Sequence, residues 1–423
     1  MAIKAIKIET LISRVLLVLA GGVFLTAFFF FAAWSFANAI GSQAVDKEIA
    51  EITTRLAPSD PQTHYALAAL NEQSFVSEDL PKSLAEYETA TALSPHDYRL
   101  WLAFGKARER NGDRAGAELA LRRAAELAPN YAEVQWALGN TLLRIGKTDE
   151  GFAMIRQAAE SDVKFANPAI STAWQFFDGD SAQIKQNLGG STKINSALAV
   201  FLAKQKRFDA ALEVWNALPA GEEENKTTIK QNGEELFKEM LAEKRFRDAL
   251  EIQTQIGETE GFAPEKIFNG GFETDVATKN ASVFEWQIAD GLQPQIGFDN
   301  EQKHGGNRSL VVVFNSFNGK DFRAISQTIA VEPRRNYKFE VFYKSDLKTS
   351  ATLKWEIADA SSGKVLATTE ATDAVSDWKS LRVEFAASET TQAVVVQLAR
   401  ENCKAGVCPI SGKVWFDDFS INQ

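Results

Sequence analysis

The sequence predicts a multidomain protein with an N-terminal transmembrane helix, a central all-α solenoid of helix pairs and a C-terminal all-β sandwich. Residues 15–40 carry no charged side chain. Between 44 and 257, apolar residues recur at the i, i+3, i+4 and i+7 positions that build one face of a helix. From 265 to 423, apolar and polar residues alternate, as they do along half-buried strands. The segment 258–264 is expected to link the two parts.

The apolar segment 15–40 is long enough to cross a hydrocarbon layer of ~30 Å as a helix. The residues before it are mainly basic, and those after it are mainly acidic: Lys4, Lys7 and Arg14 against Asp46, Glu48 and Glu51. The positive-inside rule therefore predicts a single-pass membrane protein with residues 1–14 in the cytoplasm. The rest of the chain is then extracytoplasmic, on the periplasmic side of the inner membrane in a Gram-negative cell.

A cleaved signal peptide is the alternative for this segment, because Ala37-Asn38-Ala39 is similar to a signal-peptidase site. The apolar run exceeds the ~7–15 residues of a signal-peptide core, which favours an uncleaved anchor.

The central segment shows its repeat most clearly between Ser94 and Asn130. The spacing predicts a helix, a turn at Asn111-Gly112-Asp113 and a second helix that this turn caps. Pro95 and Pro129 lie 34 residues apart. Between them, large and small apolar residues occupy set positions: Trp101, Phe104, Gly105, Ala117, Leu121 and Ala124.

This pattern resembles the tetratricopeptide (TPR) repeat family, with Arg108 in place of one usual aromatic residue. The resemblance implies stacked helix pairs and a concave surface that takes an extended peptide or a helix of a partner protein. Residues 163–190 fit the pattern poorly, and the polar segment 219–235 is expected to form a loop. Five hairpins fit it: 64–95, 94–130, 131–162 and two later ones that have matching turns at Lys206 and Lys244.

About ten strands are predicted between 265 and 423, because the segments there are rich in β-branched and aromatic residues. Turn dipeptides separate several of these strands: Asn318-Gly319, Ser362-Gly363 and Ser411-Gly412. Together these features predict one antiparallel sandwich.

The ends of the β region carry a more specific pattern, in three stretches: Phe268 to Glu273, His304 to Leu310 and Val414 to Ile421. They resemble the galactose-binding-like jelly roll of carbohydrate-binding modules of the family 4/9 type. The likeness covers Ile267 to Asn422 and implies that the first stretch begins a strand.

The resemblance also implies a structural calcium ion. Glu273 and one of Asp417 or Asp418 would supply carboxylates, and carbonyls of residues 304–309 would complete an all-oxygen shell. The alternative is that the two aspartates only cap the last strand and accept hydrogen bonds from loop amides.

A glycan needs aromatic faces, so we predict four candidate binding residues: Trp355, Tyr343, Phe322 and Trp415. Trp355 and Tyr343 are placed mid-strand, where they would line a concave cleft. Trp286 and Trp378 match family positions that usually pack internally. The alternative is that all these rings form the core, as most aromatic residues of a sandwich do.

Cys403 and Cys408 flank four residues before the final strand. Predicted export favours a disulfide between them, worth about 2 kcal/mol for so short a loop. The spacing alone leaves two free, buried thiols as the alternative.

Composition and motifs argue against several functions. A net charge of −10 leaves no basic stripe for a nucleic acid. No nucleophile elbow, P-loop or metalloprotease motif occurs. Asp417 and Asp418 are adjacent on a strand and should point to opposite faces, so they cannot flank one glycosidic bond. We therefore predict that the protein is not an enzyme.

The sequence favours a membrane-anchored extracytoplasmic scaffold. Its repeats would bind a partner protein, and its jelly roll would bind a glycan or another envelope component, in polysaccharide assembly or export. The alternative is a scaffold for proteins only, with the sandwich as a rigid spacer.

Overall fold

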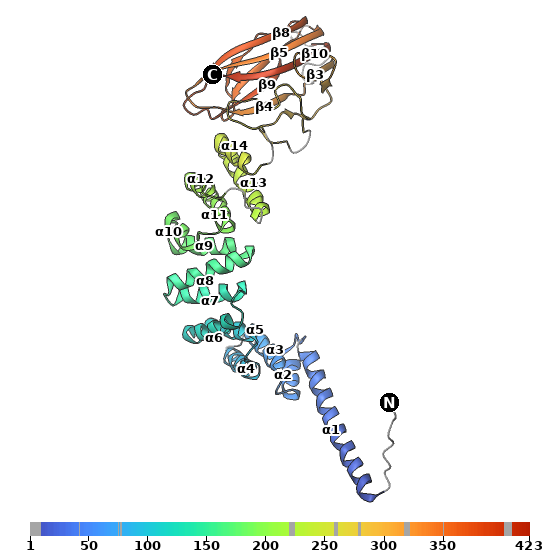
Figure 1. Cartoon of the computed structure of the whole chain (residues 1–423), viewed down its shortest axis with the longest axis vertical. Helices are drawn as coiled ribbons and strands as arrows, with labels where there is room; N and C mark the ends of the chain where they lie inside the picture. The colour runs from blue at the N-terminus through green and yellow to red at the C-terminus, as the bar shows by residue number, and fades with distance from the viewer. Residues whose placement is uncertain are drawn as a thin grey trace. The chain divides into compact units, whose positions relative to one another are not determined.

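The computed structural model describes residues 10–423 except 42, 75, 77, 220–224, 258–260, 278–280, 317–321, 350 and 402–407. The chain divides into two compact units, and the boundary between them lies between Asn195 and Ser196. The predicted fold class is confirmed: one long apolar helix, pairs of helices and a sandwich of two antiparallel sheets follow one another along the chain (Figure 1). The division between the units lies inside the segment 44–257 that we expected to form one helical domain.

The first helix, α1 (Leu11–Gly41), is long and apolar enough to cross a membrane. Its large apolar side chains are exposed from Leu11 to Phe36, whereas Ala37 and Gly41 near its end are buried. The side of the membrane on which the rest of the chain lies stays a prediction.

The helices of the first unit pack in successive antiparallel pairs. They are α2 (Lys47–Leu56), α3 (Pro61–Gln73), α4 (Asp79–Leu93), α5 (Tyr98–Arg110), α6 (Arg114–Leu127), α7 (Ala132–Arg144), α8 (Thr148–Ser161), the 3₁₀ helix η1 (Val163–Phe165), α9 (Ala166–Phe176) and α10 (Ser181–Leu188). Helix pairs α3–α4, α5–α6 and α7–α8 are the three regular hairpins that the spacing predicted.

Small residues let the two helices of a hairpin approach closely. A Cβ atom added at Gly105 of α5 would lie 2.5 Å from Cγ of Leu121 on α6. The turn between these helices is also as predicted. Gly112 has a φ of 82°, and Asp113 caps α6 by accepting a hydrogen bond from the N–H of Gly116 at 2.9 Å.

In the part of the second unit that the structure describes before the sandwich, four helices follow one another: α11 (Thr192–Lys204, whose first turn belongs to the first unit), α12 (Phe208–Asn216), α13 (Lys226–Ala242) and α14 (Phe246–Gln255). The matching turns predicted at Lys206 and Lys244 are confirmed, because both residues have a left-handed φ of about 60°. The loop predicted at 219–235 is wrong from Lys226 onward, where α13 begins. Gly233 and Leu236 of α13 are buried, so tertiary packing holds this polar stretch helical.

The sandwich contains ten described strands in two antiparallel sheets, in the orders β1-β4-β9-β6-β7 and β2-β3-β10-β5-β8. The strands are β1 (Gln287–Ile288), β2 (Gln295–Asp299), β3 (Ser309–Ser316), β4 (Ile325–Ala330), β5 (Asn336–Thr349), β6 (Thr352–Asp359), β7 (Val365–Thr368), β8 (Val375–Ala386), β9 (Ala393–Glu401) and β10 (Ile410–Asn422). Strand β10 is central in its sheet, and large aromatic side chains fill the space between the sheets.

Two details of the predicted strand pattern are wrong. Ser411-Gly412 does not separate strands but lies inside β10, where Gly412 takes a φ of 106°. The stretch from Phe268 to Glu273 forms a turn instead of a strand, because Asn269 and Phe272 both have positive φ. The predicted turn at Asn318-Gly319 lies outside the described residues.

Candidate functional site

A groove with a volume of about 600 Å³ runs along three successive hairpins of the first unit. Four of the chain's six tyrosines line it: Tyr65 from α3, Tyr87 from α4, Tyr98 from α5 and Tyr131, which directly precedes α7. The repeat places them there, since Tyr65, Tyr98 and Tyr131 follow one another at intervals of 33 residues. The resemblance implied a concave binding surface, but these residues were not singled out from the sequence.

The tyrosines of the groove contact one another in pairs. The rings of Tyr98 and Tyr131 lie 5.1 Å apart between centroids, and those of Tyr65 and Tyr87 lie 5.9 Å apart. Tyr87 is the deepest of the four, and its hydroxyl donates to Glu72 Oε2 at 3.1 Å. Burial of this ring, with the Glu72 charge adding to the effect, raises the pKa of Tyr87. The hydroxyl group of Tyr87 therefore stays protonated at neutral pH and keeps its hydrogen bond to Glu72.

The charged residues of the groove are paired with one another. Lys106 Nζ lies 2.8 Å from Glu133, and Arg110 forms an ion pair with Glu72. Arg99, which also lines the groove, forms an ion pair with Asp97 at 2.6 Å. Because these cations already have carboxylate partners, aromatic faces and hydroxyl groups are the features that the groove offers to a ligand.

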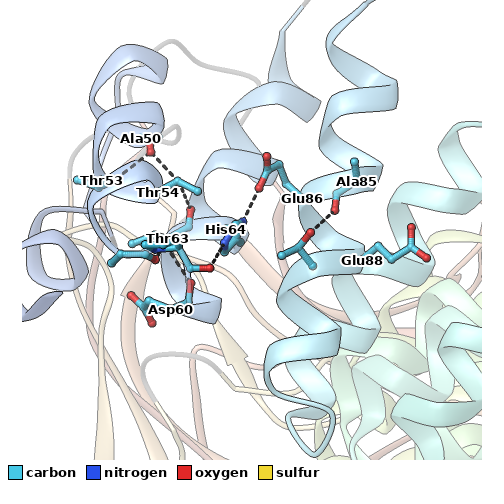
Figure 2. Close-up of polar contacts among 12 residues, drawn as sticks. Ala50, Thr53, Thr54, Asp60, Thr63, His64, Ala85, Glu86 and Glu88 are labelled. Atoms are coloured by element: carbon cyan, nitrogen blue, oxygen red, sulfur yellow. Dashed lines mark hydrogen bonds and ion pairs between the residues drawn. The ribbon is translucent and has the colours of Figure 1, made fainter.

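A polar network holds the first hairpin beside α2 (Figure 2). The ring of His64 lies between two acceptors: Nδ1 is 2.5 Å from Glu86 Oε2 on α4, and Nε2 is 3.0 Å from the carbonyl oxygen of Pro58. Only the doubly protonated ring can donate to both. The hydrogen bond to Glu86 is the main cause that raises the pKa of His64 above its usual value. His64 therefore has a structural role in the first hairpin.

Two of the four predicted sugar-binding residues lie in the core, so the prediction that they line a cleft is wrong. Trp355 and Tyr343 are both fully buried. The ring of Trp355 packs against Phe416 and Phe419, at centroid distances of 5.2 and 4.8 Å, and its indole N–H has no hydrogen-bond partner among the described residues. Neither ring has a free face for a sugar.

The other two predicted residues are not open platforms either. Phe322 is half-buried against the core. Trp415 is 7% exposed, and its indole N–H donates to Asp299 Oδ2 at 2.9 Å. The structure does not bring Phe322 and Trp415 together with Trp355 and Tyr343 into one site.

A different set of rings lies on the outer face of the sheet β2-β3-β10-β5-β8. We call His304, Phe342 and Trp378 the outer-face cluster. The His304 ring stacks on Phe342 with centroids 3.8 Å apart, and it lies 5.7 Å from the ring of Trp378. Trp378 is half-buried here, which differs from the internal position that we predicted for it.

Strand alternation was the signal for Phe342 that the sequence interpretation missed. Tyr343 points inward with Val341 and Phe339, so Phe342 between them must point outward. Ion pairs flank the outer-face cluster: Lys344 lies 3.1 Å from Asp377, and Arg382 lies 2.7 Å from Glu340. The arrangement combines ring faces with charged hydrogen-bonding groups.

The residues predicted to bind calcium accept hydrogen bonds from N–H groups. Glu273 accepts from the backbone and the side chain of Asn307, both at 2.8 Å, and these bonds lower its pKa. Asp417 Oδ2 accepts from the backbone N–H of His304 and Gly305, at 2.8 and 3.0 Å. Oxygens that face N–H donors do not fit a cation, so the calcium ion stays a sequence prediction that these hydrogen bonds do not favour.

The described residues contain no group of three or more His, Cys, Asp or Glu side chains placed to hold a metal ion.

Burial is the main cause that raises the pKa of Asp417, and the hydrogen bonds from the backbone amides of Gly305 and His304 act in the opposite direction.

Asp417 and Asp418 do not point to opposite faces of the sheet, so this prediction is wrong. A bulge interrupts the pairing of β10 between Asp417 and Ser420, and Asp418 has a φ of 49°. As a result both carboxylates reach the same residue: Asp417 binds the N–H of His304, and Asp418 Oδ2 lies 2.6 Å from its Nδ1. The two aspartates position His304 in the outer-face cluster.

Cys408 is buried, and Cys403 lies outside the described residues. The disulfide between them therefore stays a prediction.

No protein-family model and no curated protein matches the chain. Among solved structures, a CBM4 structure is 12% identical over 37% of this chain and 98% of its own, with a TM-score of 0.28. TmCBM61, in complex with beta-1,4-galactotriose, is 14% identical over 38% of this chain and 99% of its own, with a TM-score of 0.28. A thermophilic TPR protein of Thermus thermophilus is 24% identical over 30% of this chain and 70% of its own, with a TM-score of 0.27. These similarities concern the fold alone and assign the chain to no family.

Proposed function

We propose that this protein is a membrane-anchored, non-enzymatic scaffold that holds a segment of a partner protein in the tyrosine-lined groove. The observation that carries this proposal is the groove itself, in which four tyrosines from three successive hairpins meet over about 600 Å³. Tyrosine is enriched at protein–protein interfaces, because its side chain combines a large apolar face with a hydroxyl group.

The groove favours a ligand segment with apolar or aromatic anchors over one that is selected by charge. Its lysine and arginine residues already face carboxylates, and exchanging one exposed ion pair for another brings little free energy. The rings of Tyr65, Tyr98 and Tyr131, in contrast, are partly exposed and can be covered by an apolar side chain. The hydroxyl groups would then bind the backbone of the segment.

Site-specific photo-crosslinking in cells tests this use of the groove. A photoreactive residue at Tyr98 or Tyr131 should crosslink to the same partner. The same residue at Leu119, an exposed apolar position on α6 outside the groove, is the matched control and should not.

Once the partner is purified, Tyr98→Ala should weaken its binding about tenfold or more, because a central tyrosine of an interface contributes about 2 kcal/mol. Equal binding by the wild type and Tyr98→Ala would contradict the proposal.

We propose as a second function that the sandwich binds a glycan at the outer-face cluster. The favouring observation is that Phe342 and Trp378 are both partly exposed beside His304, within reach of flanking ion pairs. Ring faces can cover the C–H surface of a sugar, and the charged groups can bind its hydroxyls. A role in polysaccharide assembly or export, on the extracytoplasmic side, would follow from such binding.

A glycan array with the full chain tests the second function. Trp378→Ala should lose the signal, whereas Leu292→Ala, which removes an exposed apolar residue elsewhere in the sandwich, should keep it. If no glycan binds, the sandwich is a spacer and the scaffold binds proteins only.

A further inference from the structure

Helix α2 (Lys47–Leu56) buries its small and polar residues and exposes its large apolar ones. Ala50, Thr53 and Thr54 are buried, and Thr54 donates to the carbonyl oxygen of Ala50 at 2.8 Å (Figure 2). Ile49, Ile52 and Leu56 are 42%, 54% and 51% exposed. A helix of a protein that is surrounded only by water would bury the isoleucines instead.

The exposed residues form one stripe. Ile49, Ile52 and Leu56 have the i, i+3 and i+7 spacing of a single helix face. Val45, two residues before α2 begins, extends this stripe and is exposed as well. Other exposed apolar residues of the repeats, such as Leu119 and Val163, occur singly. We call Val45, Ile49, Ile52 and Leu56 the α2 stripe.

Contacts with the end of α1 fix the position of α2 (Figure 1). Gly41, the last residue of α1, lies so close that an added Cβ would be 3.0 Å from Thr53 Oγ1 on the buried face of α2. Asn38 donates to Asp60 Oδ2 at 2.7 Å, which ties the same turn of α1 to the start of α3. These contacts join α2 and the start of α3 to the end of the apolar helix.

The exposed apolar surface of α1 ends at Phe36, one residue before the buried Ala37. Leu11 to Phe36 would measure about 39 Å as a helix, which exceeds a hydrocarbon layer of ~30 Å. The end of α1 that holds α2 therefore lies at the level where the chain leaves the lipid.

We propose that α2 is an interfacial helix whose stripe inserts into the membrane that α1 spans, at the boundary between headgroups and acyl chains. The occupant of the stripe is this lipid surface, because the contacts with α1 bring the stripe to it. Helices with one apolar face and one charged face bind membranes in this way, and Lys47, Glu48 and Arg55 supply the polar side here. The inference rests on the proposed anchoring by α1. If α1 spans the membrane and α2 lies in its surface, the hydrogen bond between Asn38 and Asp60 would also fix the orientation of the groove relative to the membrane.

Fluorescence of an environment-sensitive dye on single introduced cysteines tests the proposal in the full chain in lipid nanodiscs. The positions are Ile52→Cys in the stripe, Glu48→Cys on the polar side of α2, Phe28→Cys in α1 and Leu119→Cys on α6. The parent chain, with only Cys403 and Cys408, gives the background signal. Nanodiscs with and without lipids that carry a quencher on the acyl chain are compared.

The proposal expects the probe at position 52 to emit at shorter wavelength and to lose most of its emission to the quencher, as the probe at 28 does. The probes at 48 and 119 should lose much less. If the probe at 28 is quenched but the probe at 52 behaves like that at 119, the membrane span holds and the placement of α2 is overturned.

If the probe at 28 also escapes quenching, the proposed anchor fails and the inference fails with it. A probe at 52 that is shielded without lipid quenching, together with a crosslink between two copies at this position, would assign the stripe to a second copy of the chain and overturn the proposal.

Discussion

The helical repeats and the sandwich differ in where they place their tyrosine residues. Four of the six tyrosines lie along the groove of the repeats, while Tyr337 and Tyr343 are buried in the sandwich. The cause is the distance that each architecture must fill. Helices of a hairpin approach closely over Ala and Gly, as between Gly105 and Leu121, and Tyr65, Tyr98 and Tyr131 remain at the surface. Two stacked sheets lie ~10 Å apart and need large side chains between them.

This difference indicates which aromatic residues of each domain are free to contact a ligand. In the repeats, a tyrosine at the start of a helix is not needed for the core and can serve a ligand. In the sandwich, a ring binds a ligand only if it lies on the outward phase of its strand, as Phe342 does.

The largest expected effect comes from removing a ring of the sandwich core. Trp355→Ala should destabilise the sandwich by about 3–5 kcal/mol, because it leaves a cavity among Trp286, Phe416 and Phe419. Urea unfolding followed by near-UV circular dichroism measures the loss. Tyr98→Ala in the groove is the matched control and should cost less than about 1 kcal/mol. Equal effects of the two substitutions would contradict the comparison.

A smaller effect is expected from pH at the first hairpin. The folded-state pKa of His64 is raised, so its contribution to stability is complete below the unfolded value of about 6.5 and is lost as pH rises through the folded value. The wild type should therefore exceed His64→Gln in unfolding free energy at low pH, and the difference should shrink as pH rises.

Urea unfolding of both proteins between about pH 5 and 8 measures this difference. A difference that stays constant or grows with pH would show that the contacts of His64 with Glu86 and Pro58 do not depend on its charge.

The smallest effect is expected from calcium. Glu273 and Asp417 already accept N–H hydrogen bonds, so adding calcium or a chelator should leave the melting temperature of the sandwich unchanged. Calorimetry with each addition measures this. An increase of several degrees with calcium would mean that these carboxylates turn toward an ion, as the resemblance to carbohydrate-binding modules implied.

The helix pairs could be predicted because their contacts are local: the spacing of Ala117, Leu121 and Ala124 already defines the face that packs on α5. The strands could be predicted from alternation, but alternation does not say which face is the core. Choosing Tyr343 instead of Phe342 as a binding residue was the consequence.

Two other features depend on long-range contacts that no local pattern carries. The bulge at Asp417 and Asp418 turns two adjacent carboxylates toward His304, more than a hundred residues away in the sequence. The helical start of α13 at Lys226 is held by buried residues that come later in the helix. The groove was implied by the repeat, but its tyrosine lining appears only when three hairpins are placed together.

Tyrosine footprinting of the intact, membrane-bound chain tests most directly the claim that the groove presents rings while the sandwich buries them. A tyrosine-modifying reagent followed by mass spectrometry gives one rate for each of the six residues. We expect Tyr65 and Tyr131 to react fastest, Tyr98 to follow, and Tyr87, Tyr337 and Tyr343 to be protected. Fast modification of Tyr343 together with protection of Tyr65 and Tyr131 in the partner-free protein would contradict the account.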